Sequence, residues 1–503
     1  MRPSFNVLNE PWIPVVAQDG ERLLLGIRET LRRAPELKEI SVVSPLEEFS
    51  IYRFLSVFLM DALRPEDRDN IEELLDEGSF DMEQIEEYIS LCESEGVSFD
   101  LFHEKRPFMQ SAYVKEWDKE AKPVSVIDCS LPSGNNHLHF EHRCAQDHYL
   151  YFSDVFPKLL AANLFAINGG KGYQPSISSD RGKNPYMVLI CGANLFQTLC
   201  YMLLPTSEHD YDEEKAGGWM YIPQIKDNEI PDTSFLRMML YPVRSILLKP
   251  GESQDVISET YYCSGYKLPE KGIWREPNAA YQKILVKEDG ESLEKWISVS
   301  PNQDVAPWRN YAELVRSSGR PEVLSRFLKL DLGWENAAVI LYGLCSDENN
   351  NRIKTIRCDL RIPRKLLEDD TRVDLIHACI KDADAIETAL KRALRIALQH
   401  EKEDAKGKER KQANAQTEAV ADTYYSKCES LFWKLIDDAG CCNNACLHQL
   451  KQTWTRDVFA LAHQEYTRAV SGIMARGQMF RNIVLGEDIL HEWNTPGKRR
   501  KKK

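Results

Sequence analysis

The sequence predicts an α+β protein, in which a mixed, irregular N-terminal globular domain precedes a C-terminal antiparallel four-helix bundle. Three observations support this prediction. Between residues 219 and 300, short apolar and aromatic runs alternate with Pro and Gly turns, which is typical of strands. After residue 370, four long segments carry apolar residues at i, i+3 and i+4, which is typical of amphipathic helices. At 503 residues, the chain is also too long for one compact core.

The change of pattern near Leu366 divides the chain. We expect an N-terminal domain over residues 1–366, the bundle over 367–494 and a disordered basic tail over 495–503. Residues 43–63 have apolar residues at helical spacing, and Ser44 with Glu47 three positions later fits a capping box. Residues 337–363 predict a strand, a polar hairpin tip and a second strand.

Two further segments are less regular. Residues 186–204 are apolar throughout, and their pattern does not decide between helix and strand. Residues 401–416 are rich in charge and are expected to form a connector between two helices.

Composition limits the class of protein. Apolar residues make up 43% of the chain and charged residues 28%, as in ordinary globular proteins. No apolar run approaches the roughly 20 residues that span a bilayer, and the start of the chain lacks a signal-peptide pattern. We therefore expect a cytoplasmic protein with no membrane partner, and its thirteen scattered cysteines fit a reducing compartment.

The charge is unevenly distributed. The net charge of −14 argues against a general nucleic-acid binder, because contact with phosphates needs local Lys and Arg. Basic stretches nevertheless occur at 352–365, 391–411 and 498–503, whereas 66–87 is acidic. This asymmetry is typical of a subunit that touches nucleic acid on one side only.

Catalytic signatures are missing from the sequence. The motifs HExxH, GxxxxGK[ST] and GxSxG do not occur, so we expect no enzyme and no cofactor. Two Cys/His groups leave a structural zinc site as an alternative, although neither contains a CxxC pair. For the first group we prefer the interpretation that its members are ordinary loop residues. For the second we prefer the interpretation that its members pack in the core of the helical bundle. The groups are Cys129, His137, His139, His142 and Cys144, and then Cys441, Cys442, Cys446 and His448.

The turn-rich segment 168–185 is the best candidate for binding an anion. Its glycines would let the backbone approach a ligand without a Cβ in the way, and its interleaved cations favour an anionic ligand. A mobile surface loop is the alternative. The tip at 346–352 precedes a basic strand, and its Asn side chains suit either a plain turn or contact with a groove edge.

Several motifs, in their order along the chain, resemble the CasA family, the large subunit of the type I-E CRISPR surveillance complex (Cascade). They are LNEPWIPV (8–15), RPFMQ (106–110), NGGKG (168–172) with RGKNP (181–185), WREPNAAYQ (274–282), APWRNYAEL (306–314), the polar hairpin before a basic strand, and the C-terminal helices. The resemblance spans nearly the whole chain, and LNEPWIPV and RPFMQ are its most specific parts.

Membership of that family would imply a non-catalytic subunit of a complex that carries crRNA. Such a subunit recognises the PAM of double-stranded target DNA from the minor groove, helps to open the duplex and holds the displaced strand. Its implied partners are the other Cascade subunits, the crRNA, the target DNA and a helicase-nuclease that the complex recruits.

The resemblance also assigns roles to residues. The glycine loop falls on Gly169 and Gly170, with Lys171 beside them. The lysine finger falls on Lys267, which we prefer, or Lys271. The wedge falls on the hairpin tip, where the family's glutamine is missing. Because Asn is one methylene shorter, either wedging is shallower or Arg352 enters the duplex. The tip residues are Asn349, Asn350, Asn351 and Arg352.

Two more sets follow from the resemblance. The loop that docks on the crRNA and neighbouring subunits is expected at Asp128, Cys129, Ser130, Leu131, Asn135 and Asn136. The displaced strand is expected along Lys354, Arg357, Lys391, Arg392 and Arg395, through contacts that ignore base sequence and weaken with salt.

Two rival hypotheses belong to other functional classes. A metal-dependent nucleic-acid enzyme would use the Cys/His groups. A structural scaffold that binds only proteins would fit the net charge of −14.

Overall fold

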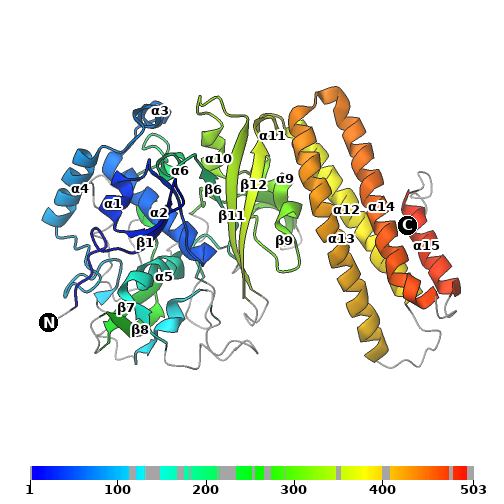
Figure 1. The fold of residues 1–503 in the computed structure, drawn as a ribbon, viewed down its shortest axis with the longest axis horizontal. Coiled ribbons are helices and arrows are strands. Elements are labelled where there is room, and N and C mark those ends of the chain that lie inside the picture. The colour runs from blue at the N-terminus through cyan, green and yellow to red at the C-terminus, as the bar shows by residue number, and fades with distance from the viewer. Residues whose placement is uncertain are drawn as a thin grey trace. The chain divides into compact units, whose positions relative to one another are not determined.

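The computed structural model describes most of the chain (Figure 1). The described residues are 3–112, 120–129, 131, 148–166, 175–179, 183–211, 215, 234–251, 255–265, 274–288, 291–346, 353–398, 408–474 and 480–494. The chain forms two compact units. The first comprises Met1–Val305 and Ser318–Arg361, and the second comprises Ala306–Ser317 and Ile362–Lys503.

The first unit contains both helices and strands. Its helices are α1 (Ile27–Arg32), α2 (Pro45–Leu63), α3 (Arg68–Glu77), α4 (Met82–Ser94), the 3-10 helix η2 (Val124–Ile127), α5 (Phe152–Leu164), α6 (Leu195–Met202), α8 (Phe235–Met239) and α10 (Glu322–Phe327). Its strands are β1 (Ile13–Ala17), β2 (Arg22–Leu25), β3 (Leu37–Ile40), β4 (Lys122–Pro123), β5 (Leu150–Tyr151), β6 (Met187–Cys191), β7 (Arg244–Pro250), β8 (Val256–Ser264), β9 (Tyr281–Glu288), β10 (Glu291–Ser298), β11 (Asn336–Ser346) and β12 (Ile353–Pro363), which runs into the second unit.

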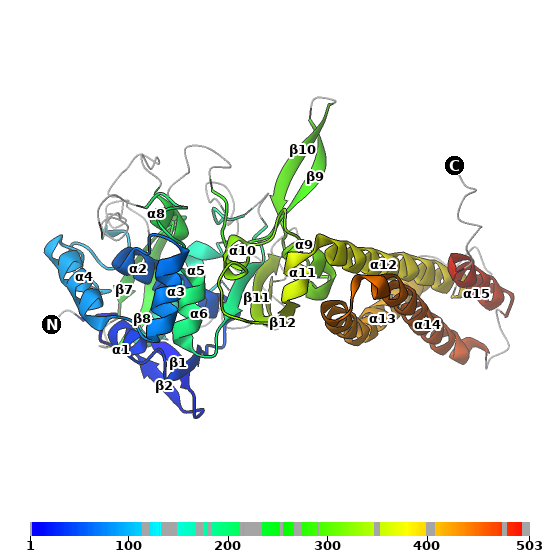
Figure 2. The ribbon, with the colours of Figure 1, turned by 90° about the horizontal axis from the view of Figure 1, so that it is seen from above.

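The described strands form four small sheets. Their orders are β2-β1-β3, β10-β9, β12-β11-β6 and β4-β8-β5, with β7 also paired to β8. The strand β11 lies antiparallel to β6, with Val339 opposite Ile190. The hairpin β9–β10 extends away from the other sheets of this unit (Figure 2). The strand-rich middle and the two strands predicted at 337–363 are thus confirmed, while the predicted tip at 347–352 lies outside the described residues.

Helix α2 forms the centre of the first unit. Nearly all its side chains are buried, and it contacts α4, α5, α6, α8, β3 and β11. The Ser44 side chain accepts a hydrogen bond from the Glu47 amide, so the predicted N-terminus is confirmed. The Glu47 carboxylate instead binds Lys158 at 2.6 Å. The capping-box prediction therefore holds for the serine, while the glutamate serves another contact.

Aromatic side chains pack α2 against the start of the chain. Trp12, from the LNEPWIPV motif, is completely buried and lies edge-on to Phe54 of α2 and to Phe156 of α5, with ring centroids 6.0 and 4.7 Å apart. Its indole nitrogen donates to the Val7 carbonyl at 2.8 Å. The motif is therefore a core anchor, because a buried indole is stabilised when its N–H finds an acceptor.

The ambiguous segment 186–204 contains both kinds of element. The strand β6 ends at Cys191, and Asn194 caps α6 by accepting a hydrogen bond from the Gln197 amide at 2.9 Å. Both elements are buried, so both are apolar and the periodic signal that separates strand from helix is lost.

The second unit is helical. It contains η4 (Pro307–Asn310), α9 (Tyr311–Val315), α11 (Arg364–Glu368), α12 (Asp370–Ala397), α13 (Lys408–Cys441), η5 (Asn444–Cys446), α14 (Leu447–Met474) and α15 (Phe480–Asn494). Helix α12 contacts α13, α14 and α15. A mixed α and β chain with a helical C-terminal region is thus confirmed. The connector prediction for 401–416 was wrong from Lys408 onward, where α13 begins. No described helix combines the length and apolar character needed to cross a membrane.

Candidate nucleic-acid interface

Many predicted contact residues lie outside the described part of the chain. These are Gly169, Gly170, Lys171, Lys267, Lys271, Asn349, Asn350, Asn351, Arg352, Ser130, Asn135 and Asn136. The structure does describe the residues on either side of each of these segments. The bases of the predicted loops can therefore be examined.

The described residues on either side of 167–174, here called the glycine segment, contact one another. Helix α5 leads into it and ends at Leu164, and Ala166 is the last described residue before it. The Ser176 amide, just beyond the segment, donates to the Ala166 carbonyl at 2.7 Å. The Asn184 side-chain amide donates to the Phe165 carbonyl at 3.3 Å. Backbone and side-chain bonds thus join the described residues on either side of 167–174.

The lysine segment, which lies between Gly265 and Trp274, also has a fixed start. The Gly265 amide donates to the Val243 carbonyl at 3.0 Å, just beyond the end of β8. A Cβ on Gly265 would lie 2.3 Å from the Pro242 carbonyl oxygen. Only glycine fits such a close backbone approach.

One small apolar cluster joins the two bases. Its buried members are Ala166, Met238, Tyr241 and Val243, and the partly buried Ile177 and Trp274 pack against it. Ala166 and Ile177 lie on either side of the glycine segment, while Trp274 directly follows the lysine segment. Both segments therefore emerge from the same apolar support.

A buried polar network reinforces this support. Arg53 of α2 forms an ion pair with Glu276, and each side chain is 1% exposed. The Ser178 hydroxyl donates to the Glu276 carboxylate at 2.9 Å. The Trp274 indole N–H in turn donates to the Ser178 oxygen at 3.3 Å. The network thus links the residues that follow both segments.

Asn278 completes the network. Its side-chain oxygen accepts from Arg53 at 2.9 Å, and its side-chain nitrogen donates to the Val188 carbonyl at 2.8 Å. The Glu276 amide donates to the Tyr281 hydroxyl at 2.7 Å. Because a buried charge is costly unless paired and hydrogen-bonded, these contacts allow the ion pair to stay in the core.

A second network holds the predicted wedge hairpin. The Tyr342 hydroxyl of β11 donates to the Glu48 carboxylate at 2.7 Å, and Arg357 Nε of β12 donates to it at 3.0 Å. Burial raises the pKa of Glu48, whereas these two hydrogen bonds lower it. Arg357 also pairs with Asp359, and Lys354 Nζ donates to the Gln303 carbonyl at 3.3 Å. Arg357 therefore ties β12 to α2.

The start of the predicted docking loop is fixed by charge. Lys158 of α5 binds both Glu47 and Asp128, at 2.6 and 2.9 Å. The Leu131 amide donates to the Asp128 carbonyl at 3.0 Å. Burial raises the pKa of the Cys129 thiol to about 12, and its sulfur donates to the Ala161 carbonyl.

A family comparison identifies the chain. The model of the family described as CRISPR-associated protein Cse1 matches residues 6–464. The chain belongs to the Cse1 family. The resemblance to the CasA family is thereby confirmed.

Individual relatives agree with this assignment. The CRISPR-associated protein CasA/Cse1 of Thermus thermophilus is 27% identical over 330 residues, which are 63% of this chain and 61% of that protein, so the match spans less than two thirds of that relative. The crystal structure of Thermus thermophilus CasA matches with a TM-score of 0.76 at 20% identity, over 97% of this chain and 99% of that one. A chain of a CRISPR RNA-guided surveillance complex matches with a TM-score of 0.73 at 19% identity, over 97% and 100%. The structural likenesses show a shared fold.

The basic residues on α12 of this Cse1-family chain differ in their partners. Lys391 forms ion pairs with Glu387 at 2.7 Å and with Glu418. Arg395 is half exposed and lies 3.6 Å from Glu418. Arg392 is exposed and forms no ion pair among the described residues. Its guanidinium is therefore the most available of the three for a phosphate.

The second Cys/His group does not pack in a core. Cys441 and Cys446 are exposed, and Cys442 is half buried. His448 shares a hydrogen bond with Gln452 at 2.9 Å. The core-packing prediction was wrong because α13 ends at Cys441 and α14 begins at Leu447, so these residues lie at the junction between the two helices.

The sequence motifs contain Glu276 but do not indicate that it pairs with Arg53. Glu276 and Asn278 lie in WREPNAAYQ, but nothing in that motif names their partner. The position of Arg53 within a largely apolar helix could have predicted a buried ion-pair partner, because a charge there needs a counter-charge.

Proposed function

We propose that this Cse1-family chain is the non-catalytic large subunit of a crRNA-guided type I-E Cascade complex. In this role it recognises the PAM of double-stranded target DNA from the minor groove and helps to open the duplex. It then holds the displaced strand and supports recruitment of the helicase-nuclease. The fold shared with a chain of an RNA-guided surveillance complex supports crRNA and other subunits as partners.

One observation carries the proposal: the glycine and lysine segments share a base. A glycine segment that reads a narrow groove must keep a fixed position relative to the lysine segment. A displacement of about 1 Å weakens a preorganised site. The apolar cluster around Trp274 and the Arg53–Glu276 pair supply that rigidity. We assign Gly169, Gly170 and Lys171 to the groove, with Lys267 or Lys271 beside them. The hairpin tip at Asn349, Asn350, Asn351 and Arg352 is the wedge.

The remaining assignments follow the charges. We propose that α12–α15 form an antiparallel four-helix bundle whose Arg392 and Arg395 contact the displaced strand, and we assign Lys354, Arg357 and Lys391 to the same strand. The segment from Asp128 to Asn136 docks on the crRNA and neighbouring subunits. The ion pair of Lys158 with Asp128 supports this assignment, because it fixes the start of that segment.

A reconstituted complex tests this proposal. The variants Gly170→Asp and Lys267→Ala should lose binding to a PAM-flanked duplex while crRNA assembly is unchanged. Lys283→Ala, on the exposed hairpin β9–β10, is the matched control and should bind normally. Unchanged duplex affinity in Gly170→Asp would refute PAM reading by this loop.

A further inference from the structure

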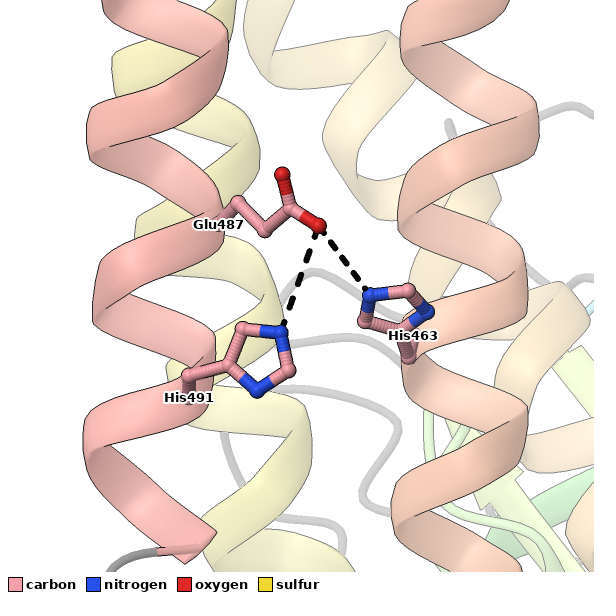
Figure 3. Close-up of side chains that lie close together, drawn as sticks. All are labelled: His463, Glu487 and His491. Carbon is pink, nitrogen blue, oxygen red and sulfur yellow. Dashed lines mark hydrogen bonds and ion pairs between the residues drawn. The ribbon is translucent and has the colours of Figure 1, made fainter.

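Two histidines and a glutamate meet on the last two helices. His463 lies on α14, and Glu487 and His491 lie on α15. In Figure 3, dashed lines join one oxygen of the Glu487 carboxylate to both imidazole rings. Oε1 lies 3.3 Å from His463 Nε2 and 4.0 Å from His491 Nε2. One ligand atom from each residue lies within 4.8 Å of the other two. We propose that these three side chains bind a divalent transition-metal ion of the zinc class, which fastens α15 to α14.

The donor set suits such an ion. Two imidazole nitrogens and one carboxylate oxygen are a common zinc ligand set, in which water or a fourth group fills the open position. With bonds of about 2.0–2.2 Å, tetrahedral donors lie about 3.3–3.5 Å apart. The observed separations need only small side-chain rotations to reach that geometry. Glu487 and His491 are four residues apart, so they project from one face of α15.

The charge at the site also favours a cation. Glu487 has both histidines as its ion-pair partners, and no Lys or Arg of the described chain lies within 4.0 Å of its carboxylate. Among the described residues, no fixed positive charge therefore competes with a metal ion for this carboxylate. All three side chains are partly exposed, which leaves a path for an ion to enter.

Close helix packing prepares the site. At Gly486, beside Glu487, a Cβ would lie 2.3 Å from the Tyr466 hydroxyl oxygen and 2.7 Å from the Ala393 carbonyl. The Tyr466 hydroxyl donates to the Ile483 carbonyl of α15 at 2.5 Å. Helix α15 therefore approaches α14 closely at this point, and the ligands are brought together before any ion binds.

A second cluster provides a useful contrast. Glu208, His209 and Glu322 also lie within ligand distance of one another. There, however, Arg326 lies 3.6 Å from Glu208, and the His209 ring stacks on Phe235 with centroids 3.9 Å apart. A fixed positive charge beside a carboxylate disfavours a metal cation, so this cluster is better explained as an ion-paired surface.

Metal titration of the whole, tag-free chain tests the site. After chelator treatment, zinc is titrated by calorimetry and Co²⁺ binding is followed by its visible absorption. We expect the wild-type chain to bind one more equivalent than the His463→Ala/His491→Ala variant, which keeps every cysteine. Glu487→Gln preserves the side-chain shape and should weaken binding at least about 10-fold. His377→Ala, a partly exposed histidine 3.6 Å from Glu313, is the control and should bind as wild type.

Hydrogen exchange supplies a second measurement. Zinc should slow amide exchange in α15 of the wild-type chain and of His377→Ala, and leave α15 of His463→Ala/His491→Ala unchanged. Equal zinc uptake by the wild-type chain and the double variant would overturn the proposal. The three side chains would then form only contacts between imidazole and carboxylate groups. Circular dichroism of each variant shows whether the helices are retained, so that loss of binding is not mistaken for unfolding.

Discussion

Arg53 and Glu276 form an ion pair in the core of the first unit, although 223 positions separate them in the sequence. Arg53 belongs to the central helix α2, and Glu276 follows the predicted lysine segment. Replacing a buried pair by apolar residues is often neutral, whereas removing one partner is costly. We infer that this pair serves to position the residues that follow the segment rather than to add net stability.

Arg53→Met should be strongly destabilising because it leaves the Glu276 carboxylate buried without its counter-charge. We expect a loss of about 3–5 kcal/mol in the free energy of unfolding, measured by urea denaturation with tryptophan fluorescence. The double variant Arg53→Met/Glu276→Gln should recover part of that loss. Lys283→Ala removes one side of the exposed Lys283–Glu294 pair and should have a much smaller effect. If the loss in the double variant equalled the sum of the losses in Arg53→Met and Glu276→Gln alone, the two residues would not be coupled.

Ser178→Ala tests whether the network positions the loops. The hydroxyl bridges Glu276 and Trp274, so its removal should cost roughly 1 kcal/mol of stability. If the network sets loop geometry, the variant complex should bind a PAM-flanked duplex about 2- to 10-fold more weakly. Ser90→Ala removes an exposed hydroxyl that bonds only within α4 and should leave duplex binding unchanged. Wild-type duplex affinity in Ser178→Ala would show that the network is structural only.

Sequence reasoning succeeded where a signal is local. The apolar spacing of 43–63 and Ser44 at its start predicted α2, because capping and periodicity act within one or two turns. The long C-terminal helices were predicted for the same reason. The charged residues from Lys408 onward were misjudged, since a helix that begins with a run of charged residues resembles a linker in composition.

The contacts that organise the site could not be predicted in the same way. The partner of Arg53 lies 223 residues away, and no periodicity connects the two. The group at Cys441–His448 was considered as a metal site because its members are neighbours in sequence. The histidines and glutamate that actually converge come from two helices and meet only when α15 packs on α14.

Glu48 should give the first unit a measurable pH dependence. Burial raises its folded-state pKa above the ordinary value of 4.5. Its stabilising contribution is therefore complete below pH 4.5 and is lost as pH rises through the folded pKa. Glu48→Gln cannot titrate, so its free energy of unfolding should fall less steeply with pH just above 4.5 than that of the wild type. Urea denaturation at a series of pH values measures this slope.

Tyr342→Phe provides the complementary measurement. The Tyr342 hydroxyl donates to Glu48, and this hydrogen bond lowers the pKa of the carboxyl group. Its removal should raise that pKa further and extend the pH-dependent window upward. A variant whose window is unchanged would mean that the Tyr342 bond does not control the titration of Glu48.

Arg392→Ala tests the proposed path of the displaced strand. Arg392 is exposed on α12 without an ion pair among the described residues, so a phosphate can bind it without displacing a carboxylate. One lost phosphate contact should reduce the slope of log K against log salt by about 0.7 for single-stranded DNA. The loss should be the same for strands of different sequence, because backbone contacts carry no base information. Arg456→Ala is the matched control, since that exposed arginine of α14 already pairs with Asp457 at 2.9 Å. If both variants changed the slope equally, general surface charge rather than a defined track on α12 would hold the strand.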